Sequence, residues 1–246
     1  MTDEIVVARR ILALIDLTSL NATDTDESVT ALAALAATPA GRVAAVCIWA
    51  RFIAVARARL VGTGVPIAVV ANFPDGASDV LAAADETAAA VAHGADEVDV
   101  VFPYRALLAG DSASGVALVR ACRDACGSQA LLKVILETGQ LVTPERIRHA
   151  SELAVEGGAQ FLKTSTGKSQ PGATLPAATV MLDVIESARR RGISVGFKAS
   201  GGVGTIAAAQ GYLELYEQRF GKGSATPATF RIGASSLLKS VLATLG

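Results

Sequence analysis

The segment Val43-Ala44-Ala45-Val46-Cys47-Ile48 carries no polar side chain at any position. A strand with one face in water alternates apolar and polar residues, whereas a parallel strand covered on both faces can be apolar throughout. The segment therefore predicts a buried parallel strand. Similar short runs recur along the chain, and together they predict strands at 14–17, 44–48, 67–73, 97–102, 131–137, 161–165, 194–198 and 230–233.

Alanine-rich segments with helical spacing separate these strands. They predict a short helix before the first strand and further helices at 26–37, 51–61, 78–92, 112–126, 143–156, 176–190, 205–220 and 235–244. Eight strand–helix units in about 240 residues are typical of a (β/α)8 TIM barrel, so we expect one barrel domain spanning 1–246. An open, doubly wound sheet is the structural alternative.

Composition excludes several classes of function. Of the 246 residues, 51% are hydrophobic and 18% are charged, so the core is large for the surface available. The net charge of −1 and the lack of a basic stripe argue against nucleic acid as a partner. Asp3 and Glu4 stand where a signal peptide would be positive, and no apolar run approaches about 18 residues, so we expect neither secretion nor a membrane partner. The cysteines lack metal-ligand spacing and suit a reduced, cytoplasmic setting.

Two lysines lie near the ends of short apolar runs that open into glycine-bearing loops. The runs are Phe161-Leu162-Lys163-Thr164-Ser165-Thr166-Gly167-Lys168 and Val195-Gly196-Phe197-Lys198-Ala199-Ser200-Gly201-Gly202. In a barrel the carboxyl ends of the strands converge on one mouth, where such enzymes place their chemistry. A buried lysine is costly because desolvation disfavours its charge. A neutral amine can attack a carbonyl, so the pair indicates Schiff-base chemistry.

Energy estimates show that a second lysine nearby can supply most of the required pKa shift. A free lysine with a pKa near 10.4 is neutral to only about 0.04% at pH 7, and lowering its pKa to about 7 requires roughly 4.6 kcal/mol. A second ammonium about 4 Å away, at an effective dielectric near 20, supplies roughly 4 kcal/mol. We therefore expect Lys163 and Lys198 to repel each other, with burial supplying the remainder.

Carboxylates on two other strands are candidates for the same site. In Glu97-Val98-Asp99-Val100-Val101-Phe102, alternation places Asp99 on the face of Glu97 and Val101. A carboxylate in so apolar a strand needs a cation, which Lys198, Lys163 or Lys133 could supply. We interpret Asp99 as catalytic, moving protons, with a buried structural ion pair as the alternative. Asp16 is interpreted as a polar substrate contact or as a cap of the following loop.

Segments after the last three strands resemble an anion-binding site. Gly167-Lys168, Gly201-Gly202 and Gly233-Ala234-Ser235-Ser236 offer bare backbone N–H groups, two hydroxyls and one ammonium, which would hold a phosphate dianion. Ordinary turn and cap chemistry is the alternative. The predicted substrate-binding residues are Asp16, Thr166, Gly167, Lys168, Gly201, Gly202, Gly233, Ser235 and Ser236.

Some apparent motifs carry no function. Gly167-Lys168-Ser169 resembles the end of a P-loop, but Leu162 stands where that motif needs glycine. Gly202-Val203-Gly204-Thr205-Ile206-Ala207 fits a dinucleotide fingerprint only loosely and comes late in the chain. His93 and His149 lack metal-ligand partners, so we expect no metal and no cofactor. Cys47 is expected to line the mouth or to fill the core as a small side chain.

The motifs resemble the deoxyribose-phosphate aldolase family over nearly the whole chain. The matching stretches include Asp16-Leu17-Thr18-Ser19-Leu20-Asn21, Gly94-Ala95-Asp96-Glu97-Val98-Asp99-Val100-Val101, Leu132-Lys133-Val134-Ile135-Leu136-Glu137-Thr138-Gly139, Lys163-Thr164-Ser165-Thr166-Gly167 and Gly233-Ala234-Ser235-Ser236. The resemblance implies a metal-independent class I aldolase that converts 2-deoxy-D-ribose 5-phosphate to D-glyceraldehyde 3-phosphate and acetaldehyde. It also implies that Lys163 forms the Schiff base, that Asp99 and Lys198 exchange protons, and that the protein is a homodimer. The residues alone leave open which lysine is the nucleophile.

The chain departs from the family pattern in two places. Many relatives carry arginine where this chain has Gly204, so a phosphate contact is missing or comes from elsewhere. Some relatives also extend into a tail ending in tyrosine, whereas this sequence ends at Gly246. The rival functions are another metal-independent phosphosugar lyase on the same barrel and a catalytically inactive sugar-phosphate-binding regulator.

Overall fold

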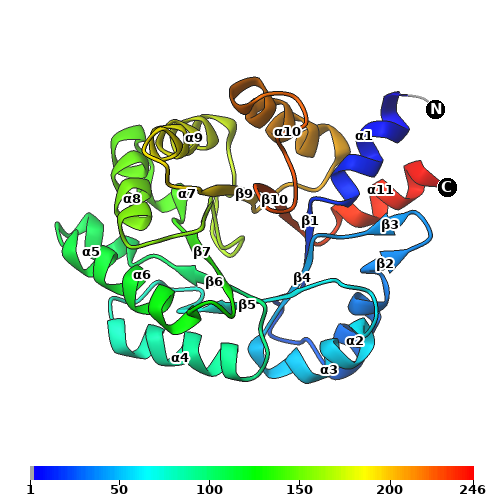
Figure 1. Ribbon diagram of the computed structural model, residues 1–246, viewed down its shortest axis with the longest axis horizontal. Helices are drawn as coiled ribbons and strands as arrows, with labels where there is room; N and C mark the ends of the chain where they lie inside the picture. Colours follow the sequence, from blue (N-terminus) through cyan, green and yellow to red (C-terminus); the bar gives the residue numbers. More distant parts are fainter. Residues whose placement is uncertain (1–2) are drawn as a thin grey trace.

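The computed structural model describes residues 3–246. Its eight parallel strands form a closed barrel, in which β1 pairs with both β4 and β10 (Figure 1). In chain order these strands are β1 (Ile15–Thr18), β4 (Ala45–Ile48), β5 (Ile67–Ala71), β6 (Glu97–Val101), β7 (Leu131–Ile135), β8 (Phe161–Lys163), β9 (Gly196–Ser200) and β10 (Phe230–Ala234). The TIM barrel is confirmed, and the open sheet is wrong because the sheet has no free edge.

Helices surround the barrel as an outer layer (Figure 1). They are α1 (Asp3–Leu12), α2 (Asp26–Ala34), α3 (Ile53–Leu60), α4 (Val80–Ala92), α5 (Tyr104–Leu108), α6 (Ala113–Cys126), α7 (Thr138–Leu141), α8 (Pro144–Glu156), α9 (Leu175–Arg190), α10 (Ile206–Phe220) and α11 (Leu237–Leu245). A short 3-10 helix, η1 (Ala50–Phe52), precedes α3. Of the helices in residues 3–246, none has both the length and the apolar character needed to cross a membrane.

Several boundaries differ from the predicted ones. The strand predicted at 194–198 lies two residues later, as β9, because Gly196 is the residue that pairs with Phe161 of β8. A Cβ at Gly196 would lie 2.5 Å from the Phe161 ring, so only glycine fits this position. Lys198 therefore lies in the middle of its strand, whereas Lys163 ends β8.

Sequence periodicity did not predict the short elements. The helix predicted at 26–37 ends at Ala34, and an antiparallel hairpin of β2 (Ala37–Thr38) and β3 (Gly41–Arg42) follows. Helices α5 and α7 contain too few residues to show a repeating apolar face. Helix α7 starts directly after Glu137, whose φ of 55° turns the chain away from β7.

Alternation along the strands divides the core into two layers. Residues such as Val98, Val134 and Leu162 point outward and belong to the large hydrophobic cluster under the helices. Inside the barrel a smaller cluster contains Leu20, Ala45, Cys47, Ala68 and Val70. Charged side chains also occupy the interior, and these form the site.

Candidate active site

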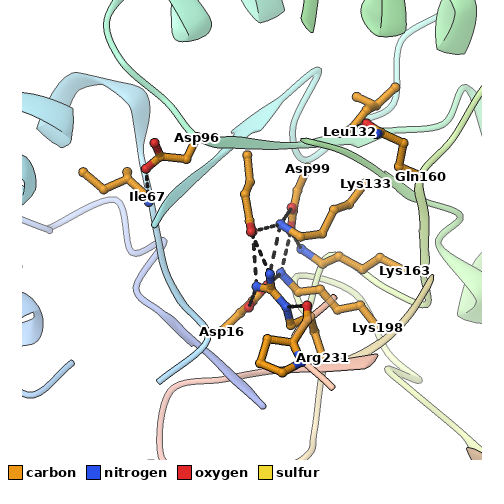
Figure 2. A network of polar contacts seen from close by, with 12 residues as sticks. Asp16, Ile67, Asp96, Asp99, Leu132, Lys133, Gln160, Lys163, Lys198 and Arg231 are labelled. Carbon is orange, nitrogen blue, oxygen red and sulfur yellow. Dashed lines mark hydrogen bonds and ion pairs between the residues drawn. The ribbon is translucent and has the colours of Figure 1, made fainter. Parts of the chain in front are cut away.

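Charged side chains from six strands converge inside the barrel (Figure 2). All have an exposed fraction of 5% or less, so their charges are compensated by one another rather than by water. They are the carboxylates Asp16, Glu97 and Asp99 and the cations Lys133, Lys163, Lys198 and Arg231.

Asp99 is the centre of this network. Its Oδ1 accepts a hydrogen bond from Lys133 Nζ at 2.8 Å. Its Oδ2 accepts from Lys163 Nζ at 2.8 Å and from Lys198 Nζ at 2.7 Å. Because both nitrogens contact one oxygen, Lys163 and Lys198 are close neighbours, as the sequence predicts, and Asp99 bridges them.

Asp16 lies beneath the site. Its Oδ2 is 2.5 Å from Lys198 Nζ, and its Oδ1 accepts from Arg231 Nη1 at 2.6 Å. Like Asp99, Lys163 and Lys198, it is buried and does not line the cavity described below, so its role as a substrate contact stays a prediction. Its side chain pairs with Lys198 and Arg231, so the predicted loop cap is wrong. The following loop is instead held by Asp24, which accepts from Asn21 N at 3.0 Å.

The three lysines differ in how many carboxylates they contact. Lys133 Nζ lies 2.5 Å from Glu97 and 2.8 Å from Asp99, and Lys198 contacts Asp16 and Asp99. Lys163 contacts Asp99 alone. With four cations against three carboxylates, one positive charge is left over, and Lys163 is the least compensated cation.

The pKa shifts follow this difference. Burial lowers the pKa of Lys163, Asp99 offsets only part of that effect, and the Lys198 ammonium lowers it further. Burial also acts on Lys198 and Lys133, but their carboxylates outweigh it and raise both pKa values. The like-charge explanation is therefore incomplete: burial is the larger cause, and only Lys163 is driven toward the neutral amine.

Asp99 is held as an anion. Burial alone would raise its pKa, but the ammonium groups of Lys133, Lys163 and Lys198 outweigh burial and hold the pKa well below its usual range. The same balance of burial against Lys198, Arg231 and Lys133 lowers the pKa of Asp16. Both carboxylates are therefore ionised at neutral pH and can accept hydrogen bonds.

A cavity of about 400 Å³ lies at the carboxyl ends of these strands. Apart from Asp16, every predicted substrate-binding residue lines it, so three loops far apart in the sequence do meet. The lining residues include Thr166, Gly167, Lys168, Gly201, Gly202, Gly233, Ser235 and Ser236, together with Thr18, Ser19, Leu20, Asn21, Ser200, Val203, Gly204 and Ala234.

The cavity is rich in donors for an anion. Lys168 is the one cationic side chain among its described lining residues, and its Nζ donates to the Leu20 carbonyl at 2.6 Å. Helix α11 begins at Leu237 without a side-chain cap, so its first N–H groups are open toward Ser235 and Ser236. Gly204 also lines the cavity.

Cys47 belongs to the barrel interior rather than to the mouth. It is fully buried in the cluster with Leu20, Ala68 and Val70, and burial raises the pKa of its thiol. The small-core interpretation is therefore confirmed. Among residues 3–246, no group of histidine, cysteine and carboxylate side chains has the geometry of a metal site.

Sequence reasoning missed Glu97 and Arg231 as members of the network. Arg231 Nη2 donates to Glu97 Oε1 at 2.7 Å, across the barrel interior. The available signal was alternation, because Glu97 shares a strand face with Asp99 and Arg231 shares one with Gly233.

Comparisons with known proteins agree with the geometry. A family described as "DeoC/LacD family aldolase" matches residues 10–240. The apo form of a "putative deoxyribose-phosphate aldolase" from Toxoplasma gondii ME49 superimposes with a TM-score of 0.90 and 26% identity, covering 98% of this chain and 96% of that chain. A protein of the same description from Coccidioides immitis gives a TM-score of 0.84 and 31% identity, covering 96% and 86%.

A more distant structure supports the fold alone. The tetrameric deoxyribose phosphate aldolase from Aeropyrum pernix matches with a TM-score of 0.75 and 22% identity, covering 98% of this chain and 96% of that chain. The family match spans almost the entire barrel. Within it, Lys163 and Lys198 are paired positions on the neighbouring strands β8 and β9. The chain belongs to the DeoC/LacD family of aldolases.

Proposed function

We propose that the protein is a class I aldolase that reversibly cleaves 2-deoxy-D-ribose 5-phosphate to D-glyceraldehyde 3-phosphate and acetaldehyde through a Schiff base on Lys163. The observation that carries the proposal is the contact of Lys163 with one carboxylate, while Lys133 and Lys198 have at least two each. Lys163 is thus the lysine most easily deprotonated, and a nucleophilic amine is what imine formation requires.

The cavity supports a substrate with one phosphate group. Lys168, the single lining cation within residues 3–246, and the open N–H groups before α11 suit one dianion. The interior wall beside the lysines is apolar, with Leu20, Ala68 and Val70 around Cys47. An apolar wall suits a donor carbon without a hydroxyl group, because a buried hydroxyl without a partner is costly. This favours a 2-deoxy sugar.

The proposed reaction begins with attack of neutral Lys163 on the C1 aldehyde of the open-chain sugar. Loss of water gives an iminium, which acts as an electron sink. Through a water molecule, the Asp99 carboxylate takes up the proton of the C3 hydroxyl beside the Lys198 ammonium, as the C2–C3 bond breaks and glyceraldehyde 3-phosphate leaves. Protonation of the remaining two-carbon enamine at C2, followed by hydrolysis, releases acetaldehyde and restores the Lys163 amine.

Hydride trapping tests the assignment of Lys163. Incubation with substrate and borohydride, followed by peptide mass spectrometry, should show a reduced adduct on Lys163 and none in Lys163→Ala. The exposed Lys222 supplies a matched control, and Lys222→Ala should retain the adduct. An adduct that persists in Lys163→Ala would contradict the assignment. Absence of any adduct in the wild type would favour a sugar-phosphate-binding regulator.

Donor choice tests the substrate. With glyceraldehyde 3-phosphate as acceptor, acetaldehyde should be a far better donor than dihydroxyacetone. The reverse preference would indicate another phosphosugar lyase of the same family.

A further inference from the structure

Glu137 is a buried carboxylate that lies outside the ion network. Its exposed fraction is 1%, and within residues 3–246 no basic side chain forms an ion pair with it. Its φ of 55° lies in the left-handed region, which is unfavourable for a residue with a side chain. A strained, buried carboxylate needs a compensating role, and the reaction proposed above does not use it.

The contacts of Glu137 lie on the loop between β8 and α9, residues 164–174, which we call the phosphate loop. The Thr166 N–H donates to Glu137 Oε1 at 3.3 Å, and the Thr166 hydroxyl donates to Oε2. The Thr166 Oγ1 in turn accepts from the Lys168 N–H at 3.0 Å. A single carboxylate thus orders both residues on either side of Gly167.

These bonds occupy three donors of the phosphate loop, which are the Thr166 N–H, the Thr166 hydroxyl and the Lys168 N–H. While the Thr166 hydroxyl donates to Glu137, its hydrogen is not available to a ligand, although Thr166 lines the cavity. The loop is left with the Gly167 N–H and the Lys168 ammonium as donors toward an anion. Thr166, predicted as a substrate contact, therefore acts in this structure by shaping the loop.

The ends of the phosphate loop are fixed separately. Thr138 N donates to the Thr164 carbonyl at 2.9 Å, and Ala173 N donates to the Gly201 carbonyl at 2.9 Å. Between these ends, the Thr166 N–H donates to Glu137, and the Lys168 N–H donates to the Thr166 hydroxyl. Glu137 thus supports the part of the loop that faces the cavity, together with the bond from Lys168 Nζ to the Leu20 carbonyl.

We infer that Glu137 is a positioning residue for phosphate recognition: through Thr166 it fixes Gly167 and Lys168 in the orientation that binds the phosphate group of the substrate. This inference rests on the proposed function for the identity of the substrate. The part of the inference that concerns anion binding does not depend on the proposed function.

Glu137→Gln is the direct test, because an amide has one acceptor oxygen where the carboxylate has two. For the phosphorylated sugar, kcat/KM should fall about tenfold relative to the kcat/KM for unphosphorylated 2-deoxyribose. The fall should be mainly in KM. Glu86→Gln is the matched control, since Glu86 also accepts a loop N–H, that of the left-handed Asn72, away from the cavity. This control should leave the ratio unchanged.

A double-mutant cycle with Thr166→Val separates support from direct contact. If Glu137 acts through Thr166, adding Glu137→Gln to Thr166→Val should cause a smaller loss than Glu137→Gln alone, because only the bond from the backbone N–H of position 166 is left to weaken. Additive losses would overturn the inference. So would an equal effect of Glu137→Gln on both sugars, which indicates general damage to the fold, or no effect on either sugar.

Binding of inorganic phosphate gives a readout that needs no turnover. Trp49 is the sole tryptophan and donates to the carbonyl of Asn21, a cavity residue, so its fluorescence should report occupancy. Glu137→Gln and Thr166→Val should each weaken phosphate binding about tenfold. Should the wild type fail to cleave deoxyribose 5-phosphate, the proposed function fails while this titration still decides the role of Glu137. Unchanged phosphate affinity in both variants would refute that role.

Discussion

At the scale of single residues, a carboxylate that the two lysines do not share, Asp16, makes them chemically different. Lys198 lies between Asp16 and Asp99, and its pKa is raised despite burial. Lys163 shares only Asp99, and its pKa is lowered by burial and by Lys198. Because both lysines are buried, the difference between their pKa values follows from the count of carboxylate neighbours, and the proposal of Lys163 as nucleophile rests on that count.

Removing the charge of Lys198 should raise the pKa of Lys163. Lys198→Met removes the like charge beside Lys163, and Asp99 then shares its negative charge with one cation fewer. Lys163 should therefore stay protonated up to a higher pH. Imine formation needs the neutral amine, so the acid limb of its pH profile should move to higher pH. The yield of borohydride-trapped adduct, measured across pH, reports this limb without requiring turnover. Lys222→Met serves as control, and an unmoved limb in Lys198→Met would contradict the charge account.

At the scale of elements, loops after β8, β9 and β10 line the cavity proposed to bind an anion, and glycine allows them to meet. A Cβ on Gly172 would collide with the Gly201 carbonyl, and Gly201 has a φ of 89°. Gly204, at the end of the β9–α10 loop, has more freedom: a Cβ there would lie 3.2 Å from the Ser236 hydroxyl, which can rotate away.

Gly204→Arg should therefore strengthen phosphate binding. The new guanidinium would add a second cation to a cavity that has Lys168 alone. We expect the KM for the phosphorylated sugar to fall about threefold to tenfold, with little change for the unphosphorylated sugar. Because the cavity is open to solvent, the gain should shrink as ionic strength rises. A gain that salt does not affect would argue against a charge interaction.

At the scale of the whole molecule, barrel closure creates an interior whose charges depend on one another. The pKa values of Asp16 and Asp99 are lowered in the folded protein. A carboxylate with a depressed folded pKa stabilises the fold above its unfolded pKa, and this contribution is lost as pH falls toward the folded value. Stability should therefore decrease as pH falls below about 4, the ordinary carboxylate range.

Urea unfolding between neutral and acid pH checks this expectation. Asp99→Asn should be less stable than the wild type at neutral pH by about 3 kcal/mol, since it leaves buried cations without their anion. It should also lose less stability on acidification, because one of the responsible carboxylates is gone. Equal acid dependence in the two proteins would show that other groups control acid unfolding.

The sequence by itself determined the barrel and most members of the site. Uninterrupted apolar runs predict parallel strands, alternation places Asp99 inside, and glycines after three strands mark the anion site. These signals are local, since each depends on residues within a few positions of one another. Strand ends were less certain, as β9 shows, because they depend on which residue faces Phe161 across the ladder.

Only the tertiary structure decided which lysine is the weaker base and what Asp16, Arg231 and Glu137 do. Asp16 and Arg231 are 215 positions apart and meet because β1 closes against β10. Glu137 reaches Thr166 because β7 and β8 are neighbours. The number of carboxylates around an ammonium group depends on such distant contacts, and a charge pattern along one strand does not contain them.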